Sequence, residues 1–303
     1  MKRTIVYFAL VWIPLLAMAN SGFPQLDEIR HTPEDHKVYE KVMDELLPLR
    51  NESVPVLIMK AAEVMLETPY VGGTIEQVPE MLTVSLARTD CILLVEACVC
   101  MALTAKQDNN SFEDFCKNLR KFRYRDGITS GYESRIHYTS EWIRQAEERD
   151  LALEISRKIS GKRLEQTFSY MSAHAEKYPA LAGNPQLTER IATVEKELNG
   201  AKYYYIPKTQ LEDVQDQIQH GDMICFVSNA EGLDITHVAF AHESYICEHD
   251  CCPDGRGCPN GQRRLGFLHA SSKAKKVVLD EMTLTGYVNT SKSCKGIRII
   301  RFL

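Results

Sequence analysis

Apolar positions in the first part of the chain recur with a helical period. Residues 34–47 predict a short amphipathic helix, and residues 55–66, PVLIMKAAEVML, predict a second helix with Pro55 near its start. Residues 91–105, CILLVEACVCMALTA, are apolar on every face, which is typical of a helix buried at the centre of a domain. Asp90 directly precedes this helix and is a favourable N-cap residue.

The middle of the chain keeps helical patterns but adds aromatic residues and arginines. Residues 111–122 predict a helix, and Asn184-Pro185 begins another that Gly200 ends, which is the usual asymmetry of helix caps. Residues 128–205 as a whole predict a mixture of helix and loop.

The pattern changes after Gly221. Short β-rich runs broken by turn residues replace the helical period, and they are MICFV, ITHVAFAH, LGFLHA, KKVVL and GIRIIRF. Helices come first and a mostly antiparallel sheet comes last, an order that predicts an α+β fold. The segment of about 110–205 is expected to be an inserted cap that sets substrate specificity.

The composition is that of a globular protein, with 44% apolar and 25% charged residues over 303 positions. This length suffices for one large domain or two small ones. Because nucleic-acid-binding proteins usually carry a basic stripe, the net charge of −5 argues against nucleic acid as a partner.

The N-terminal segment has the pattern of an export signal. Two basic residues precede an almost wholly apolar run over residues 4–16, and the small-residue motif AMA ends at residue 19. A membrane anchor is the alternative, but the run is shorter than the ~20 residues that a spanning helix needs, and Pro14 interrupts it. We therefore expect a signal peptide over residues 1–19 and a periplasmic mature chain without a membrane span.

Four of the ten cysteines crowd into the segment CEHDCCPDGRGC, at residues 247–258. Crowded thiols and a histidine could form a metal site, but the chain has no second CxxC pair at zinc-finger spacing. An exported chain favours disulfides instead, and Pro, Gly and Asp are typical of a loop. We expect a loop insert over residues 246–264 that is held by disulfides, whose connectivity the sequence does not specify.

Cys91 is the first residue of the predicted buried helix. Free N–H groups and the positive end of the helix dipole lower the pKa of a thiol at this position, and the thiolate is the reactive form. The alternative is a small buried apolar residue, which is the reading we give to Cys98 and Cys100, deeper in the same helix.

Two histidines lie in predicted strands, His237 in ITHVAFA and His269 in GFLHAS. A lone histidine in a strand is more often structural than catalytic. A cysteine nucleophile, however, requires a base, and a third polar group usually orients that base. With Cys91 the two histidines form a possible catalytic set.

Five short motifs follow in order: TPYVGG (68–73), Asp90-Cys91 at a helix start, HGDMICF (220–226), THVAF (236–240) and LHAS (268–271). Together they resemble the motif series of the NlpC-type papain-like cysteine peptidases. The resemblance implies a papain-like fold, in which a helical N-terminal part with the buried nucleophile helix packs on a C-terminal antiparallel sheet. It implies Cys91 as nucleophile, His237 as base and His269 as the orienting third member. Tyr70 would lie beside the nucleophile and help bind the oxyanion.

The chain departs from this superfamily in two respects. His220-Gly221-Asp222 stands where Pro-Gly-Asp is common before the first strand. The segment between His237 and His269 is longer than is typical, because it holds the cysteine cluster.

Longer segments resemble one branch of the superfamily, and they are LRKFRYRDGITSGYESRIHYTSEW (119–142), FSYMS (168–172) and GLDITHVAF (232–240). The branch is a bacterial family of initially unknown function, later assigned as N-acetylmuramoyl-L-alanine amidases. The resemblance runs from about residue 35 to the C-terminus, so we expect residues 20–303 to form a single amidase domain. The resemblance implies that the substrates are peptidoglycan fragments (muropeptides) and that the reaction requires no metal or cofactor. We expect a monomer.

The segment 119–142 carries the expected substrate contacts. Arginine binds carboxylates through two parallel hydrogen bonds, and muropeptides carry both carboxylates and sugars, so we expect Arg135 and His137 to contact substrate. Asp234, in a matching segment, is assigned to the same set. The aromatic residues expected to stack on sugar faces are Tyr132, Tyr138 and Trp142. The alternative is that Arg123, Arg125 and Arg135 form ordinary surface ion pairs.

The residues thus predict an exported cysteine amidase that cleaves between N-acetylmuramic acid and L-Ala through a Cys-His-His triad. Three alternatives remain at this point. One is an endopeptidase of the same fold that cuts within the stem peptide, for example after γ-D-Glu. The others are a non-catalytic cell-wall-binding protein and a disulfide-rich interaction protein with an oxidised Cys91.

Overall fold

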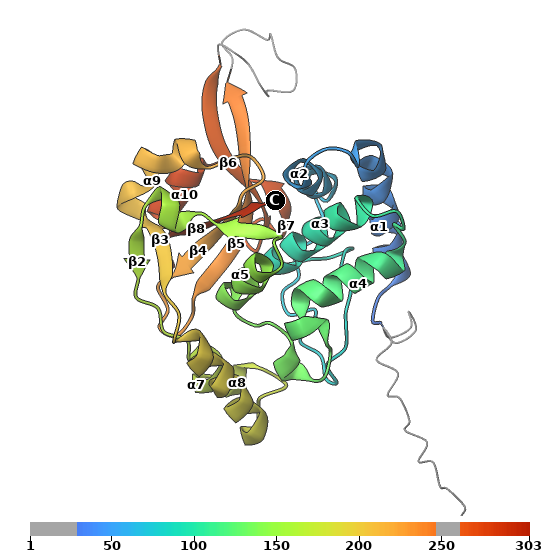
Figure 1. The fold of residues 1–303 in the computed structure, drawn as a ribbon, viewed down its shortest axis with the longest axis vertical. Helices are drawn as coiled ribbons and strands as arrows, with labels where there is room; N and C mark the ends of the chain where they lie inside the picture. The colour runs from blue at the N-terminus through green and yellow to red at the C-terminus, as the bar shows by residue number, and fades with distance from the viewer. Residues whose placement is uncertain (1–28, 247–260) are drawn as a thin grey trace, which may run out of the picture.

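The computed structural model describes residues 29–246 and 261–303. The expected signal peptide (1–19) and the cysteine cluster (247–258) lie outside the described residues. In the described part, helices precede an antiparallel sheet, so the predicted α+β class is confirmed (Figure 1). Within the same two ranges, no helix combines the length and the apolar character needed to cross a bilayer.

The α-helices are α1 (Pro33–Leu46), α2 (Val54–Val64), α3 (Cys91–Ala105), α4 (Phe112–Arg123), α5 (Thr139–Glu148), α6 (Ser156–Ile159), α7 (Tyr170–Ala173), α8 (Pro185–Leu198), α9 (Lys208–Val214) and α10 (Leu284–Thr290). Short 3-10 helices are η2 (Leu47–Leu49), η3 (Arg125–Gly127), η4 (Tyr132–Ser134), η5 (Ala175–Lys177) and η6 (Gln215–Gln217). Caps explain several starts, and the one predicted at Asp90 is confirmed. Thr32 and Asp35 form a capping box at α1, and Asp90 caps α3 with its side chain.

The strands are β1 (Ala152–Glu154), β2 (Lys162–Leu164), β3 (Tyr203–Pro207), β4 (Met223–Ser228), β5 (Ile235–Ile246), β6 (Gln262–Ser271), β7 (Lys276–Leu279) and β8 (Cys294–Phe302). They form one sheet in the order β2-β3-β8-β4-β5-β6-β7, and β1 also pairs with β8. Each of these pairings is antiparallel.

The sheet is covered on both faces, and β4 shows this most clearly. Met223, Cys225 and Val227 belong to the core cluster shared with α1–α4, whereas Ile224 and Phe226 belong to the cluster shared with α9 and α10. Side chains alternate between the two faces of a strand, so a strand covered on both sides is apolar throughout. This explains why MICFV is an unbroken apolar run.

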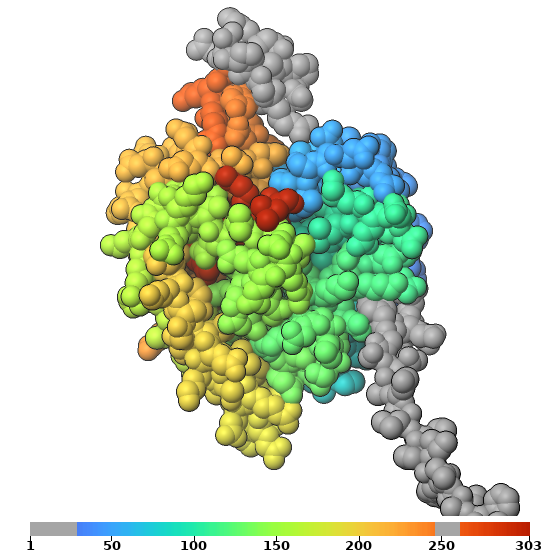
Figure 2. Space-filling view, in the orientation of Figure 1, coloured from blue at the N-terminus to red at the C-terminus, as the bar shows by residue number. Residues whose placement is uncertain are grey.

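The segment of about 110–205 is not a separate cap. Its strands β1 and β3 pair with β8, and α4 packs on α3, so much of the segment completes the main layers of the domain. The prediction of an inserted cap is wrong for these parts, because their backbone groups hydrogen-bond with the central sheet. Only the later portion, around α7 and α8, projects from the body in this view (Figures 1 and 2).

Candidate active site

The candidate nucleophile begins the buried helix α3. Cys91 is the first helical residue, and the side chain of Asp90 accepts the N–H groups of Ile92 and Leu93 at 3.1 and 3.0 Å. This cap leaves the N–H of Cys91 itself at the open end of the helix. The thiol is partly exposed and borders two cavities.

The two candidate histidines come from neighbouring strands, β5 and β6. Nε2 of His237 lies 2.6 Å from Nδ1 of His269, which is a hydrogen bond between the two imidazole rings. Cys91 lines the same two cavities as His237, and it shares the larger one with His269 as well. The structure therefore gathers Cys91, His237 and His269 in one place, while their catalytic roles stay a prediction.

The thiol of Cys91 is not activated in the way that its position suggested. Burial, together with the carboxylate of Asp90, raises the pKa of Cys91 to about 12, although backbone N–H groups at the helix start and from β5 lower it in part. The expectation of a lowered pKa is wrong, because desolvation and the capping carboxylate outweigh the helix dipole. Burial, together with the neighbouring His269, lowers the pKa of His237 to about 3. The resting site therefore holds a neutral thiol and a neutral imidazole.

Tyr70 lies in the turn before α3, on the same side as the thiol. Its backbone N–H donates to the carbonyl of Lys275 at 2.9 Å, which fixes the turn against the end of the β6–β7 hairpin. Burial raises the pKa of the Tyr70 hydroxyl, and the charges of Cys91 and Asp90 add to this effect. The hydroxyl is therefore protonated near neutral pH and can donate a hydrogen bond.

Sequence patterns do not single out two further residues of the site. Oδ2 of Asp280 lies 3.2 Å from Nε2 of His269, the nitrogen that faces away from His237. Tyr287, on α10, packs its ring 4.9 Å from that of Phe267 and lines the larger cavity. An acidic residue directly after a strand looks like any turn residue, so the sequence carried no signal for Asp280.

The two cavities meet at Cys91 and His237. The larger one, about 970 Å³, is bordered by the β6–β7 turn and α10 and includes Lys273. The smaller one, about 300 Å³, lies between α3 and the 135–142 segment and includes His137 and Trp142. Cys91 and His237 line both cavities. A substrate that spans both would present its scissile bond to the thiol.

Among the predicted substrate contacts, His137 is the one that the structure leaves available. Its Nε2–H donates to the carbonyl of Tyr132 at 2.9 Å, and the ring borders the smaller cavity. Burial lowers the pKa of His137 well below its usual value, and the nearby Arg135 lowers it further. The ring is therefore neutral, and its Nδ1 can accept a hydrogen bond from a ligand.

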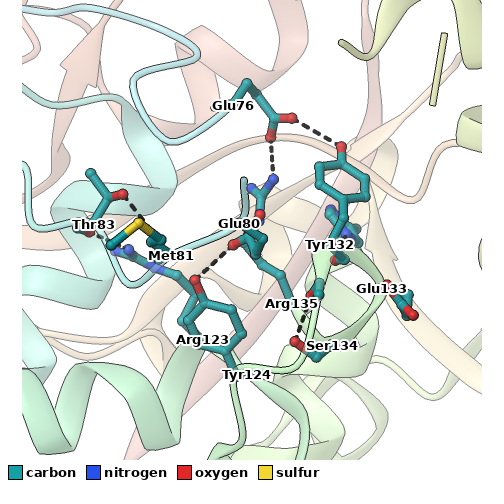
Figure 3. A network of polar contacts seen from close by, with 12 residues as sticks. Glu76, Glu80, Met81, Thr83, Arg123, Tyr124, Tyr132, Glu133, Ser134 and Arg135 are labelled. Carbon is teal, nitrogen blue, oxygen red and sulfur yellow. Dashed lines mark hydrogen bonds and ion pairs between the residues drawn. The ribbon is translucent and has the colours of Figure 1, made fainter. Parts of the chain in front are cut away.

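Arg135 and Tyr132 are engaged within the protein (Figure 3). Nη2 and Nε of Arg135 lie 2.7 and 3.2 Å from carboxylate oxygens of Glu76 and Glu80, and the Arg135 side chain is 5% exposed. The hydroxyl of Tyr132 donates to Glu76 at 2.9 Å. A guanidinium already paired with two carboxylates is poorly placed to bind a third, which argues against the predicted role of Arg135.

Three other expected contacts have side chains that are buried in structural positions, and their role as contacts stays a prediction. Asp234 borders neither cavity and instead accepts the N–H of Ser140 at 2.7 Å, in the first turn of α5. Tyr138 donates to Glu195 at 2.6 Å. Tyr138 and Trp142 border the smaller cavity but are almost wholly buried.

The arginines of this segment are not simple surface ion pairs either. Arg123 is buried and lies 2.7 Å from Glu96, which is on α3 with Cys91. Arg125 pairs with the buried carboxylate of Glu141. Arg123 therefore joins the segment to α3 through a buried ion pair, whereas the Arg125–Glu141 pair lies within the segment.

Comparisons with known proteins point to one family. A family model described as N-acetylmuramoyl-L-alanine amidase-like matches residues 60–297. An N-acetylmuramoyl-L-alanine amidase from Bacteroides uniformis, of known structure, is similar at 31% identity with a TM-score of 0.72, over 82% of this chain and 98% of that chain.

A protein from Bacteroides fragilis that carries the provisional name xylanase is similar at 36% identity with a TM-score of 0.70, over 79% of this chain and 98% of that one. Protein LPG0564 from Legionella pneumophila shares the fold, with a TM-score of 0.62 at 21% identity, over 89% of this chain and 95% of that one. A search of curated proteins gave no match.

Proposed function

The chain belongs to the N-acetylmuramoyl-L-alanine amidase-like family, and on this premise we propose that it hydrolyses the bond between N-acetylmuramic acid and L-Ala in muropeptides. The reaction uses Cys91 as nucleophile, His237 as base and His269 as the group that orients the base. It proceeds through a thioester. The enzyme acts in the periplasm after export, as the N-terminal sequence pattern suggests.

One observation carries this proposal. The imidazoles of His237 and His269 are hydrogen-bonded at 2.6 Å beside a thiol at a helix start, where two cavities meet. A structural histidine pair would not need an open cavity on either side of a neighbouring cysteine. The helix-start cysteine packed against a histidine-bearing antiparallel sheet is also the arrangement that we expect of an NlpC-type papain-like domain.

The first chemical step forms the thioester. Because thiol and imidazole are both neutral at rest, the proton of Cys91 moves to His237 as Sγ attacks the carbonyl carbon of the lactyl group. The N–H of Cys91, left free by the Asp90 cap, and the hydroxyl of Tyr70 stabilise the oxyanion. His237 then donates its proton to the departing amine nitrogen, and the C–N bond breaks.

The second step restores the enzyme. His237 takes a proton from water while the hydroxide attacks the thioester carbonyl, and the C–S bond breaks. The proton returns from His237 to the sulfur of Cys91, and the products are the muramyl acid and the free peptide. The two cavities receive the two halves of the substrate, and His137 accepts a hydrogen bond in the smaller one.

The decisive experiment is mass spectrometry of the products from a defined muropeptide. An amidase yields the muramyl sugar and an intact stem peptide, whereas an endopeptidase yields a sugar that keeps part of the peptide. Cys91→Ala should abolish turnover, and Cys98→Ala, which alters a buried thiol of the same helix, should leave it intact. A wild-type protein that binds the muropeptide without cleaving it would show instead a cell-wall-binding module.

A further inference from the structure

The contact between His269 and Asp280 extends the candidate site by one residue. Asp280 directly follows β7, and its carboxylate is fixed on both sides. Oδ2 lies 3.2 Å from Nε2 of His269, and Oδ1 accepts the N–H of Met282 at 2.9 Å. The backbone N–H of Asp280 donates to the carbonyl of Phe267, on β6, at 3.0 Å. The carboxylate therefore keeps a fixed position relative to the His269 ring.

His237, His269 and Asp280 form a row of hydrogen-bonded side chains. The position of each imidazole proton can be assigned by starting from the carboxylate of Asp280, which can only accept. Burial lowers the pKa of His269, although Asp280 raises it in part, so the ring is neutral near pH 7. A neutral imidazole has a single N–H. A bare ring nitrogen facing a carboxylate would set two acceptors against each other, so the proton of His269 lies on Nε2. Its Nδ1 is then an acceptor.

The same reasoning assigns the proton of His237. Across the 2.6 Å contact, Nδ1 of His269 accepts, so Nε2 of His237 must carry the hydrogen. Neutral His237 then has no proton on Nδ1. Cys91 and His237 line both cavities together, so this bare nitrogen belongs to the ring that shares the site with the thiol.

We propose that Asp280 is a positioning residue that selects the tautomers of both histidines, so that Nδ1 of His237 is free to take the proton of Cys91. The inference rests on the proposed function, because it assumes that His237 is the base. No proton leaves Asp280 or reaches it during the reaction. When His237 becomes an imidazolium, the carboxylate stabilises the positive charge through the neutral ring of His269.

Removing Asp280 should affect protonation more than folding. Asp280→Asn keeps the size of the side chain and an oxygen for the Met282 N–H, but its amide can either accept from or donate to Nε2 of His269. Both tautomers then become populated, and we expect kcat/KM to fall by about 10–100-fold, the scale for residues that orient a catalytic group. Asp280→Ala should fall at least as far. Asp108→Asn makes the same exchange at a fully exposed carboxylate that lines neither cavity, and it should stay near wild type.

The test measures tautomers and the thiol directly. Nitrogen-15 NMR of histidine-labelled protein should show both rings protonated at Nε2 in the wild type and in Asp108→Asn, and mixed tautomers in Asp280→Asn. The rate of Cys91 alkylation by iodoacetamide should fall in parallel with kcat/KM. His269 contacts the titratable side chains of His237 and Asp280, and Tyr287 lies farther off. Cys91, Lys273 and Glu281 line the same cavity. The acid limb of the kcat/KM profile should therefore move to lower pH in Asp280→Asn, because a charge that stabilises imidazolium is lost.

The results separate this inference from the proposed function. If Asp280→Asn keeps wild-type tautomers and the wild-type alkylation rate, the inference is wrong even when Cys91→Ala is inactive. If Cys91→Ala cleaves the muropeptide normally, the proposed function is wrong whatever the tautomers are. Thermal melting checks that both Asp280 variants are folded, and a loss of activity with unchanged tautomers would also overturn the inference.

Discussion

Replacing Arg135 by Ala should destabilise the fold far more than replacing Arg190 by Ala. Both arginines pair with glutamates in the same region, Arg135 with Glu76 and Glu80, and Arg190 with Glu133. The side chain of Arg135 is 5% exposed and that of Arg190 is 60% exposed. The two variants therefore both remove an arginine that pairs with glutamate, and they differ in how far that arginine is buried.

The expected magnitudes follow from what remains after the change. Arg135→Ala leaves Glu80, which is 4% exposed, without its cation, and breaking a buried pair in this way lowers the free energy of unfolding by ~3–5 kcal/mol. Glu76 is 26% exposed and keeps part of its hydration, so we expect a value near 3 kcal/mol. Arg190→Ala should lower the same quantity by no more than ~1 kcal/mol.

The loss of stability in Arg135→Ala should also depend on pH. Burial raises the pKa of Glu80, and Arg135 lowers it, so the variant without Arg135 has a still higher pKa at this carboxyl. An acid whose pKa is raised on folding destabilises the protein above that pKa, and the penalty disappears as pH falls through it. The gap between Arg135→Ala and wild type should therefore narrow from about pH 8 to about pH 5.

Urea unfolding followed by circular dichroism measures these differences, with Arg190→Ala as the matched control. Adding Glu80→Gln to Arg135→Ala should recover part of the loss, because a neutral amide leaves no unpaired charge. The reasoning fails if Arg135→Ala is as mild as Arg190→Ala at both pH values.

Four shorter predictions concern the site and its surroundings. The rate of Cys91 alkylation should keep rising with pH and show no plateau near neutrality, because burial raises its pKa to about 12; a plateau near pH 7 would indicate an activated thiolate. His237→Ala should abolish turnover while His269→Ala leaves some, since the base transfers protons and the third member orients it; equal small losses in kcat would contradict the triad. Gly232→Ala should lower the free energy of unfolding by ~1–3 kcal/mol in urea titrations, because its φ is +76° and a Cβ would lie 2.5 Å from a serine oxygen; an unchanged midpoint would refute this. Intact-mass measurement with and without reductant should reveal disulfides in the 247–258 segment, and stoichiometric zinc in the unreduced protein would overturn that expectation.

The sequence predicted the framework of the site better than its electrostatics. The all-apolar run after Asp90 located α3 to the residue, and MICFV located a strand buried on both faces, because periodicity and caps are local properties. The burial of Arg135 and the higher pKa of Cys91 depend on which distant groups pack around them. No local pattern contains that information, so an arginine that lies between two carboxylates was predicted to contact substrate, with a surface ion pair as the alternative.

The register of the β5–β6 hairpin has a consequence for the length of the chain between the two histidines. Pairing runs without a break from Phe240 opposite Leu268 to Ile246 opposite Gln262. At ~3.3 Å per residue, this ladder separates its far end from Phe240 by roughly 20 Å. Residues can therefore be gained or lost beyond Ile246 without moving either imidazole. A tag or a binding peptide could therefore be inserted at the far end of this hairpin, and we expect the contact between the two imidazoles to be kept.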